Sequence, residues 1–214
     1  MSRYDRQIDM VDGEEGQQKL LGARIGIVGC GGRGVHALTA LVESGIMDYV
    51  LCDPAVPQIE DLNRQFIYAA GDMRPKSVIS AEWVLALNYS AMAEAHSEPI
   101  GPDTVRMLEG CSVVLDCTES EDVGKVLYDW CSENGVPLIS STVSGYVGEI
   151  FVYIPGSYRG ALMKNPGHCR LGAVDSMVGS MQAVMAIKTI LGRVNESKII
   201  ELDLIEESME TDCP

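Results

Sequence analysis

A glycine-rich turn early in the chain has the residue types and spacing that bind a nucleotide. The run Gly-Cys-Gly-Gly-Arg-Gly begins at Gly29, and an acid, Asp53, follows its last glycine by about 20 residues. Gly29 permits the tight turn, and Gly34 lets the next helix pack close to the preceding strand. Gly31, beside Gly32, lets the backbone approach a phosphate, and Asp53 is placed to accept hydrogen bonds from ribose hydroxyls. Flanking strands favour nucleotide binding over a merely structural turn.

Two basic residues further along could neutralise phosphate charge. Arg64 lies between Asn63 and Gln65, in a segment that leaves the carboxyl end of a strand, where α/β proteins form ligand sites. The planar fork of arginine makes bidentate bonds to phosphate. Lys76 follows a proline that suits a first helical turn, which would place its ammonium near a triphosphate. Taken alone, the two residues are also explained as solvated surface charges.

An acidic cluster follows another apolar strand. Asp116 ends that strand, and Glu119, Glu121 and Asp122 come directly after it. Such carboxylates could hold Mg²⁺ beside a nucleotide. They could equally stabilise the N-terminus of the next helix, and these residues do not decide between the two.

The elements that position these residues alternate between strands and helices. Residues 1–22 form an N-terminal arm, and residues 23–214 form a single domain of the α/β class. We expect a Rossmann-like, mainly parallel sheet flanked by helices, with antiparallel strands toward the C-terminus. The expected strands lie at 25–28, before 53, and at 91–95, 111–116, 137–140, 149–154 and 198–205, with an acidic tail after the last.

A helix expected over residues 175–191 carries Met177, Met181 and Met185, each four residues from the next. This spacing predicts a methionine stripe that packs in the core.

Composition narrows the class of protein. The 214 residues carry a net charge of −15, which disfavours nucleic acids and anionic membranes as partners. We predict a cytoplasmic protein, because no apolar run approaches a membrane span and the N-terminus lacks a secretory signal. The 7 cysteines are scattered without a Cys-x-x-Cys pair, as in reduced cytosolic proteins.

Several motifs in order resemble the ThiF/MoeB/HesA family, the bacterial and archaeal relatives of ubiquitin-activating enzymes. They begin with Arg-Tyr-x-Arg-Gln at 3–7, the glycine turn at 29–34 and Asp53. They continue with Asp-Leu-Asn-Arg-Gln at 61–65, Pro-Lys at 75–76, Asp-Cys-Thr at 116–118 and Gly-Ser-Met-Gln-Ala at 179–183. The likeness runs from Arg3 to about Leu191 and is far more specific than the turn alone.

The resemblance implies an adenylyltransferase that uses ATP and Mg²⁺. Its substrate would be the C-terminal glycine of a ubiquitin-like sulfur carrier of the ThiS or MoaD type with a Gly-Gly end. By the same likeness Arg64 and Lys76 contact the phosphates, and Asp116 belongs to the nucleotide site. Arg6 would reach into the site of the other protomer in a homodimer.

The chain departs from the family pattern at three places. Glu119, followed by Ser120, stands where an aspartate of the family helps to hold Mg²⁺, so the resemblance assigns the metal to Glu119, which keeps the charge on a side chain one methylene longer. Ser157 to Gly160 replace one pair of zinc cysteines and only Cys213 remains of the other, so we predict no structural zinc. Arg33 occupies a turn position that is usually small or aliphatic in the family.

Cys169 lies in a run, His-Cys-Arg-Leu-Gly, that resembles a loop carrying a sulfur-bonding thiol in some relatives. It is a candidate nucleophile, or an ordinary loop cysteine. Two other functions stay open. A degenerate relative that binds nucleotide or carrier without adenylation is favoured by Glu119 and the missing zinc ligands. An NAD-dependent oxidoreductase is allowed by the glycine turn but opposed by Arg64 and Lys76.

Overall fold

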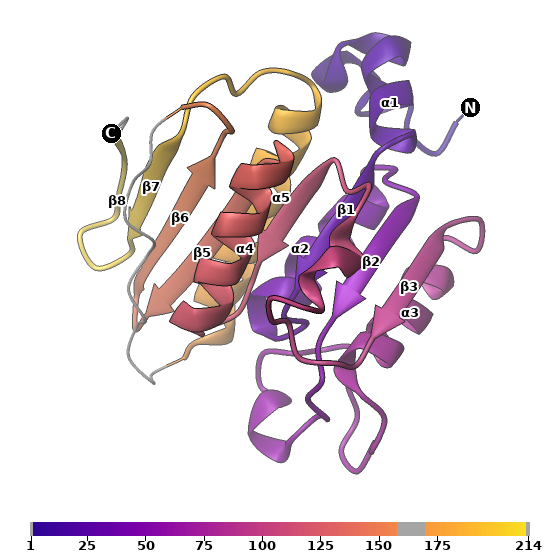
Figure 1. The fold of residues 1–214 in the computed structure, drawn as a ribbon, viewed down its shortest axis with the longest axis vertical. Coiled ribbons are helices and arrows are strands. Elements are labelled where there is room, and N and C mark those ends of the chain that lie inside the picture. Colours follow the sequence, from indigo (N-terminus) through magenta and orange to yellow (C-terminus); the bar gives the residue numbers. More distant parts are fainter. Residues whose placement is uncertain (1, 158–169, 213–214) are drawn as a thin grey trace.

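One sheet of eight strands forms the centre of the protein within residues 2–157 and 170–212, the parts that the computed structural model describes (Figure 1). Across the sheet the strands are β3 (Met92–His96), β2 (Asp48–Cys52), β1 (Arg24–Val28), β4 (Val113–Asp116), β5 (Leu138–Ser144), β6 (Val147–Tyr153), β7 (Lys198–Asp203) and β8 (Ser208–Asp212).

The direction of the strands changes in the middle of the sheet. From β3 to β5 each strand is parallel to its neighbour, and from β5 to β8 each pair is antiparallel. This arrangement confirms the predicted α/β fold class. One element was missed, because the stretch expected to be an acidic tail forms the edge strand β8 through backbone pairing with β7.

Helices cover both faces of the sheet (Figure 1). One face carries α2, α3 and α5, and the other carries α4 and η3. The apolar side chains between these layers form a separate core on each face, because neighbouring residues of a buried strand point to opposite sides. The helices are η1 (Ile8–Val11), α1 (Gly13–Leu21), α2 (Gly32–Glu43), η2 (Ile59–Asp61), α3 (Lys76–Leu87), η3 (Val105–Leu108), α4 (Glu121–Asn134) and α5 (Gly172–Ile190).

Two details qualify the expectations for the ends of the chain. The N-terminal arm packs on the domain itself, since Val11 and Leu20 are buried in the core beside α2 and α5. In α5 the prediction of a buried methionine stripe is confirmed for Met185, which is buried, and for Met181, which packs against the core, but it was wrong for Met177, which is 47% exposed. Within the described parts of the chain, α5 and the shorter helices all lack the length or apolarity needed to cross a bilayer.

Candidate nucleotide site

A cavity of about 500 Å³ opens at the carboxyl ends of β1, β2 and β4. In the sheet β1 lies between β2 and β4, so the chain turns to opposite sides of β1, and such a switch point is where ligands bind in open α/β sheets. The volume is that of an ordinary small-molecule pocket. The lining residues are Val28, Gly29, Gly31, Gly32, Arg33, Cys52, Asp53, Pro54, Asp61, Arg64, Gln65, Lys76, Glu98, Pro99, Ile100, Cys117, Thr118, Glu119, Val123, Arg170 and Asp175.

The glycine turn joins β1 to α2 in a conformation that side chains would obstruct. Gly29 has φ +91°, in the left-handed region. A Cβ on Gly34 would lie 2.0 Å from the carbonyl oxygen of Gly29, so only glycine lets α2 begin this close to the strand. A Cβ on Gly31 would meet no atom closer than 3.8 Å, which leaves this backbone accessible to a ligand. The turn thus presents the N-terminus of α2 to the cavity.

Asp53, directly after β2, is tied to the same turn. Its Oδ2 accepts a hydrogen bond from the Cys30 N–H at 2.8 Å, and its Oδ1 accepts one from the Ala55 N–H at 2.9 Å. Burial raises the pKa of this carboxyl, while the two backbone bonds act in the opposite direction. The carboxylate is therefore held in one orientation at the cavity wall.

A buried ion-pair network positions the predicted phosphate-binding residues. Asp61 Oδ2 pairs with Lys76 Nζ at 2.7 Å, and both side chains are 9% exposed. Asp61 Oδ1 contacts Arg64 Nη2 at 3.2 Å and accepts a hydrogen bond from Gln65 Nε2 at 2.9 Å. Asn63 differs from its neighbours, because it is exposed and does not line the cavity; its side-chain oxygen accepts a hydrogen bond from Arg64 Nη1 at 2.9 Å.

The end of β4 supplies a buried acid and an exposed one. Asp116 Oδ1 accepts bonds from the N–H and hydroxyl of Thr118 at 2.9 and 2.7 Å, and its Oδ2 accepts one from Ser140 Oγ at 3.2 Å. Burial raises its pKa, opposed by the Thr118 bonds. Asp116 thus lies beneath the cavity and shapes the loop that lines it. Glu119 reaches the cavity, where it contacts the guanidinium groups of Arg33 and Arg170.

Two predicted catalytic residues, Arg6 and Cys169, are not among the residues that the structure brings together at the cavity. Arg6 is exposed and does not line the cavity of its own chain. Cys169 falls outside the described residues, as do 158–160 and Cys213, on which the zinc prediction depends. The five free cysteines that the structure describes are all buried, and burial raises the pKa of each thiol.

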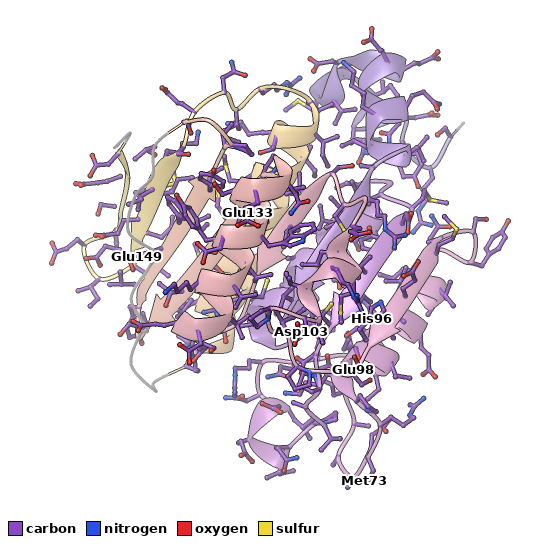
Figure 2. The ribbon with its side chains drawn as sticks, in the orientation of Figure 1. Met73, His96, Glu98, Asp103, Glu133 and Glu149 are labelled. Carbon is purple, nitrogen blue, oxygen red and sulfur yellow. The ribbon has the colours of Figure 1, made fainter. Side chains whose placement is uncertain are left out.

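Sequence reasoning missed other residues of the site. Asp61 was noted only as part of a motif, and Asp175 only as the start of a helix, yet both are buried and contact the arginines of the cavity. Glu98, which Figure 2 labels beyond the end of β3, also lines the cavity. A strand was expected at 91–95, but a single glutamate after it gave no signal for a ligand site.

Known proteins similar to this chain carry the same kind of fold. The sequence model of a protein family described as "ThiF family" matches residues 4–213 of this chain. The chain is 28% identical to the SAMP-activating enzyme E1 of Haloferax volcanii, with 100% of this chain and 88% of that protein aligned. It is 31% identical to the sulfur carrier protein ThiS adenylyltransferase of Escherichia coli, over 89% of this chain and 81% of the relative. A crystal structure of E. coli MccB with ATP superposes with a TM-score of 0.86 at 18% identity, over 99% of this chain and 70% of that one.

Proposed function

This chain belongs to the ThiF family, and we propose that it uses ATP and Mg²⁺ to adenylate the C-terminal glycine of a ubiquitin-like sulfur carrier protein. The observation that carries the proposal is the convergence of the glycine turn, Asp53, Arg64 and Lys76 on one cavity of about 500 Å³. One relative is named as an adenylyltransferase of the sulfur carrier protein ThiS and another as an enzyme that activates SAMP, and these names support the choice of substrate.

The reaction needs no group to be oxidised or reduced. A carboxylate oxygen of the terminal glycine forms a bond to the α-phosphorus of ATP. The bond between that phosphorus and the oxygen bridging to the β-phosphate breaks, and pyrophosphate leaves with the electron pair. The products are an acyl adenylate and pyrophosphate, and no proton has to move. Catalysis therefore depends on positioning and on neutralising phosphate charge.

Each group in the cavity has a role in this scheme. The backbone of the glycine turn and the N-terminus of α2 bind phosphate, and Asp53 binds the ribose hydroxyls. Arg64 and Lys76 contact the phosphate oxygens, with Asp61 holding both cations in place before ATP arrives. Asp116 orients the Thr118 backbone beneath the site.

We assign to Glu119 a metal ion that arrives with the nucleotide, and this ion would take the place of the guanidinium groups of Arg33 and Arg170 on that carboxylate. Among the residues that the structure describes, three or more His, Cys, Asp or Glu side chains nowhere gather as a metal site. Mg²⁺ in nucleotide sites is usually bound by one or two carboxylates together with phosphate oxygens. Glu119 can provide one such carboxylate at the cavity edge, and Mg²⁺ there would neutralise phosphate charge.

The experiment that tests the proposal is ATP–pyrophosphate exchange with carriers ending in Gly-Gly and Mg²⁺ present. Exchange should depend on the carrier, and Arg64→Gln should lower kcat/KM by about 100-fold, the effect of removing one cation that stabilises the transition state. Arg193→Gln is the matched control, because Arg193 is exposed and pairs with Asp12 outside the cavity lining.

Failure of exchange would separate the alternatives. If ATP binds but no carrier supports exchange, the chain is a non-catalytic relative and the proposal is wrong. If the protein binds NAD and not ATP, the result supports the alternative hypothesis of an NAD-dependent oxidoreductase.

A further inference from the structure

Arg33 is a buried cation with unused hydrogen-bond donors in the wall of the cavity. It is the second residue of α2, and its side chain is 2% exposed. Its Nη2 donates to the carbonyl oxygens of Cys117 and Thr118, each at 3.0 Å. Its Nε and Nη1 are buried and have no hydrogen-bond partner among residues 2–157 and 170–212. Burying donors of a permanently charged group without acceptors is costly, so these two atoms call for a partner that the described part of the chain does not supply.

Arg170 and Arg64 place two more guanidinium groups beside Arg33. The side chain of Arg170 is 10% exposed, touches Glu119, and lies 3.7 Å from Asp175 through Nη1. Arg64 Nε is 3.7 Å from the other oxygen of Asp175. Burial, together with the positive charges of Arg33 and Arg64, lowers the pKa of Arg170 to about 10. Each carboxylate in this part of the cavity is shared by two cations: Glu119 contacts Arg33 and Arg170, Asp175 contacts Arg64 and Arg170, and Asp61 contacts Arg64 and Lys76.

We infer that Arg33 and Arg170 form a subsite for an oxyanion at the β4 end of the cavity, beyond the glycine turn. The ligand is a phosphate or carboxylate oxygen that displaces Glu119 from the two guanidinium groups and so gains access to the donors of Arg33, which the folded chain otherwise covers. Charge-assisted bonds of this kind are the strong ones in proteins. The inference rests on the proposed function for the source of the oxyanion. That source is either the leaving phosphates of ATP or the terminal carboxylate of the acceptor.

The order of groups along the cavity supports this position. Asp53 follows β2 at one end, the glycine turn follows β1 in the middle, and Arg33 reaches the backbone at the end of β4. With the ribose on Asp53, the group that reacts with the phosphates or leaves them lies toward Arg33 and Arg170. The charge of Arg33 also acts on the buried carboxylate of Asp116, but a residue that only tied α2 to the end of β4 would need no donors beyond Nη2.

The test uses Arg33→Gln, which removes the charge and the terminal donors, and titrates the whole protein with pyrophosphate and with AMP, while the melting temperature reports any loss of structure. If the oxyanion is a phosphate, pyrophosphate affinity should fall roughly tenfold or more while AMP affinity stays unchanged. If it is the acceptor carboxylate, N-acetyl-Gly-Gly but not its amide should raise the melting temperature of the wild type, and the variant should lose that rise.

Arg170→Gln serves as a second variant, since the recorded partners of Arg170 are carboxylates and not backbone groups. Arg193→Gln is the control, because it removes an arginine beyond the far end of α5, which is roughly 28 Å long at ~1.5 Å per residue.

If neither ligand responds to Arg33→Gln or Arg170→Gln, the subsite does not exist. An equal loss of AMP and pyrophosphate binding with a lowered melting temperature would also overturn it, as a structural role. Neither readout requires turnover, so a failure of the proposed adenylation would be seen separately.

Discussion

The carboxylate of Asp61 holds two of the cations of the cavity, Arg64 and Lys76. It pairs with Lys76 and Arg64 and accepts a bond from Gln65, and it is itself 7% exposed. Burial alone would raise the pKa of Asp61, but the hydrogen bonds from Lys76 and the Gln58 N–H, with the nearby charge of Arg64, lower it below its usual value. The folded structure therefore stabilises the ionised form of Asp61 over the protonated form.

We predict that Asp61→Asn lowers the free energy of unfolding at pH 7 by about 3 kcal/mol, because it leaves the ammonium of Lys76 buried without its partner. A carboxyl whose folded pKa lies below the unfolded one contributes stability that is complete above the unfolded pKa of about 3.9. That contribution is lost as the pH falls through the folded pKa. Urea unfolding at a series of pH values should therefore show the difference between wild type and variant narrowing below about pH 4.

Glu15→Gln is the control for this measurement, since Glu15 forms an exposed pair with Lys19 and its loss should change stability little. A difference between wild type and Asp61→Asn that stays constant from neutral to acid pH would contradict the assignment.

At the scale of elements, the site depends on the close approach of α2 and α5. A Cβ on Gly179 in α5 would lie 2.3 Å from the carbonyl oxygen of Arg33 in α2, so alanine there forces the helices apart. The same helix carries Gln182, whose Nε2 donates to the carbonyl oxygens of Asp116 and Ile139 and so ties α5 to β4 and β5. The start of α2, and with it the glycine turn, is held by this packing.

Gly179→Ala should therefore destabilise the protein by about 2 kcal/mol, as overpacking does, although alanine has the higher helix propensity. It should also weaken ATP binding, because the turn moves with α2. Thermal unfolding and nucleotide titration measure the two effects. Ser180→Ala, one position further along on the exposed side of α5, should alter neither property. A Gly179→Ala protein as stable as the wild type would refute the packing argument.

Features set by local sequence patterns could be predicted, whereas features set by contacts between distant segments of the chain could not. The β1 turn and the buried strands were predictable because glycine spacing and apolar runs are local patterns. Strand β8 was missed because all its side chains are exposed, so only its backbone pairing with β7 defines it. The contacts of Arg33 and Arg170 with Glu119 could not be predicted, because they join three segments that only the folded sheet brings together.

At the scale of the whole molecule, Arg6 lies too far from the cavity of its own subunit to act there. The neighbouring Gln7 donates from Nε2 to the carbonyl oxygen of Ser44, at the C-terminal end of α2, whereas the cavity lies at the N-terminal end. The two ends are separated by the helix, about 18 Å at ~1.5 Å per residue. Figure 1 shows the N-terminus above the sheet, away from the carboxyl ends of β1 and β2. If Arg6 acts in catalysis, it must therefore act in a partner's site.

We predict that the protein is a homodimer in which Arg6→Ala and Arg64→Gln complement each other. Each variant alone should lose adenylation, because every site lacks one arginine. In a mixed dimer, the site that has an intact Arg64 receives an intact Arg6 from the partner, while the other site lacks both. When subunits exchange at random, half of the dimers contain one subunit of each variant. One of the two sites in such a dimer is intact, so about a quarter of wild-type activity should return. Pyrophosphate exchange after mixing, with mass measured by light scattering, distinguishes the arrangements. A dimer that uses Arg6 within its own chain would recover no activity, because every subunit would still lack one of its two arginines.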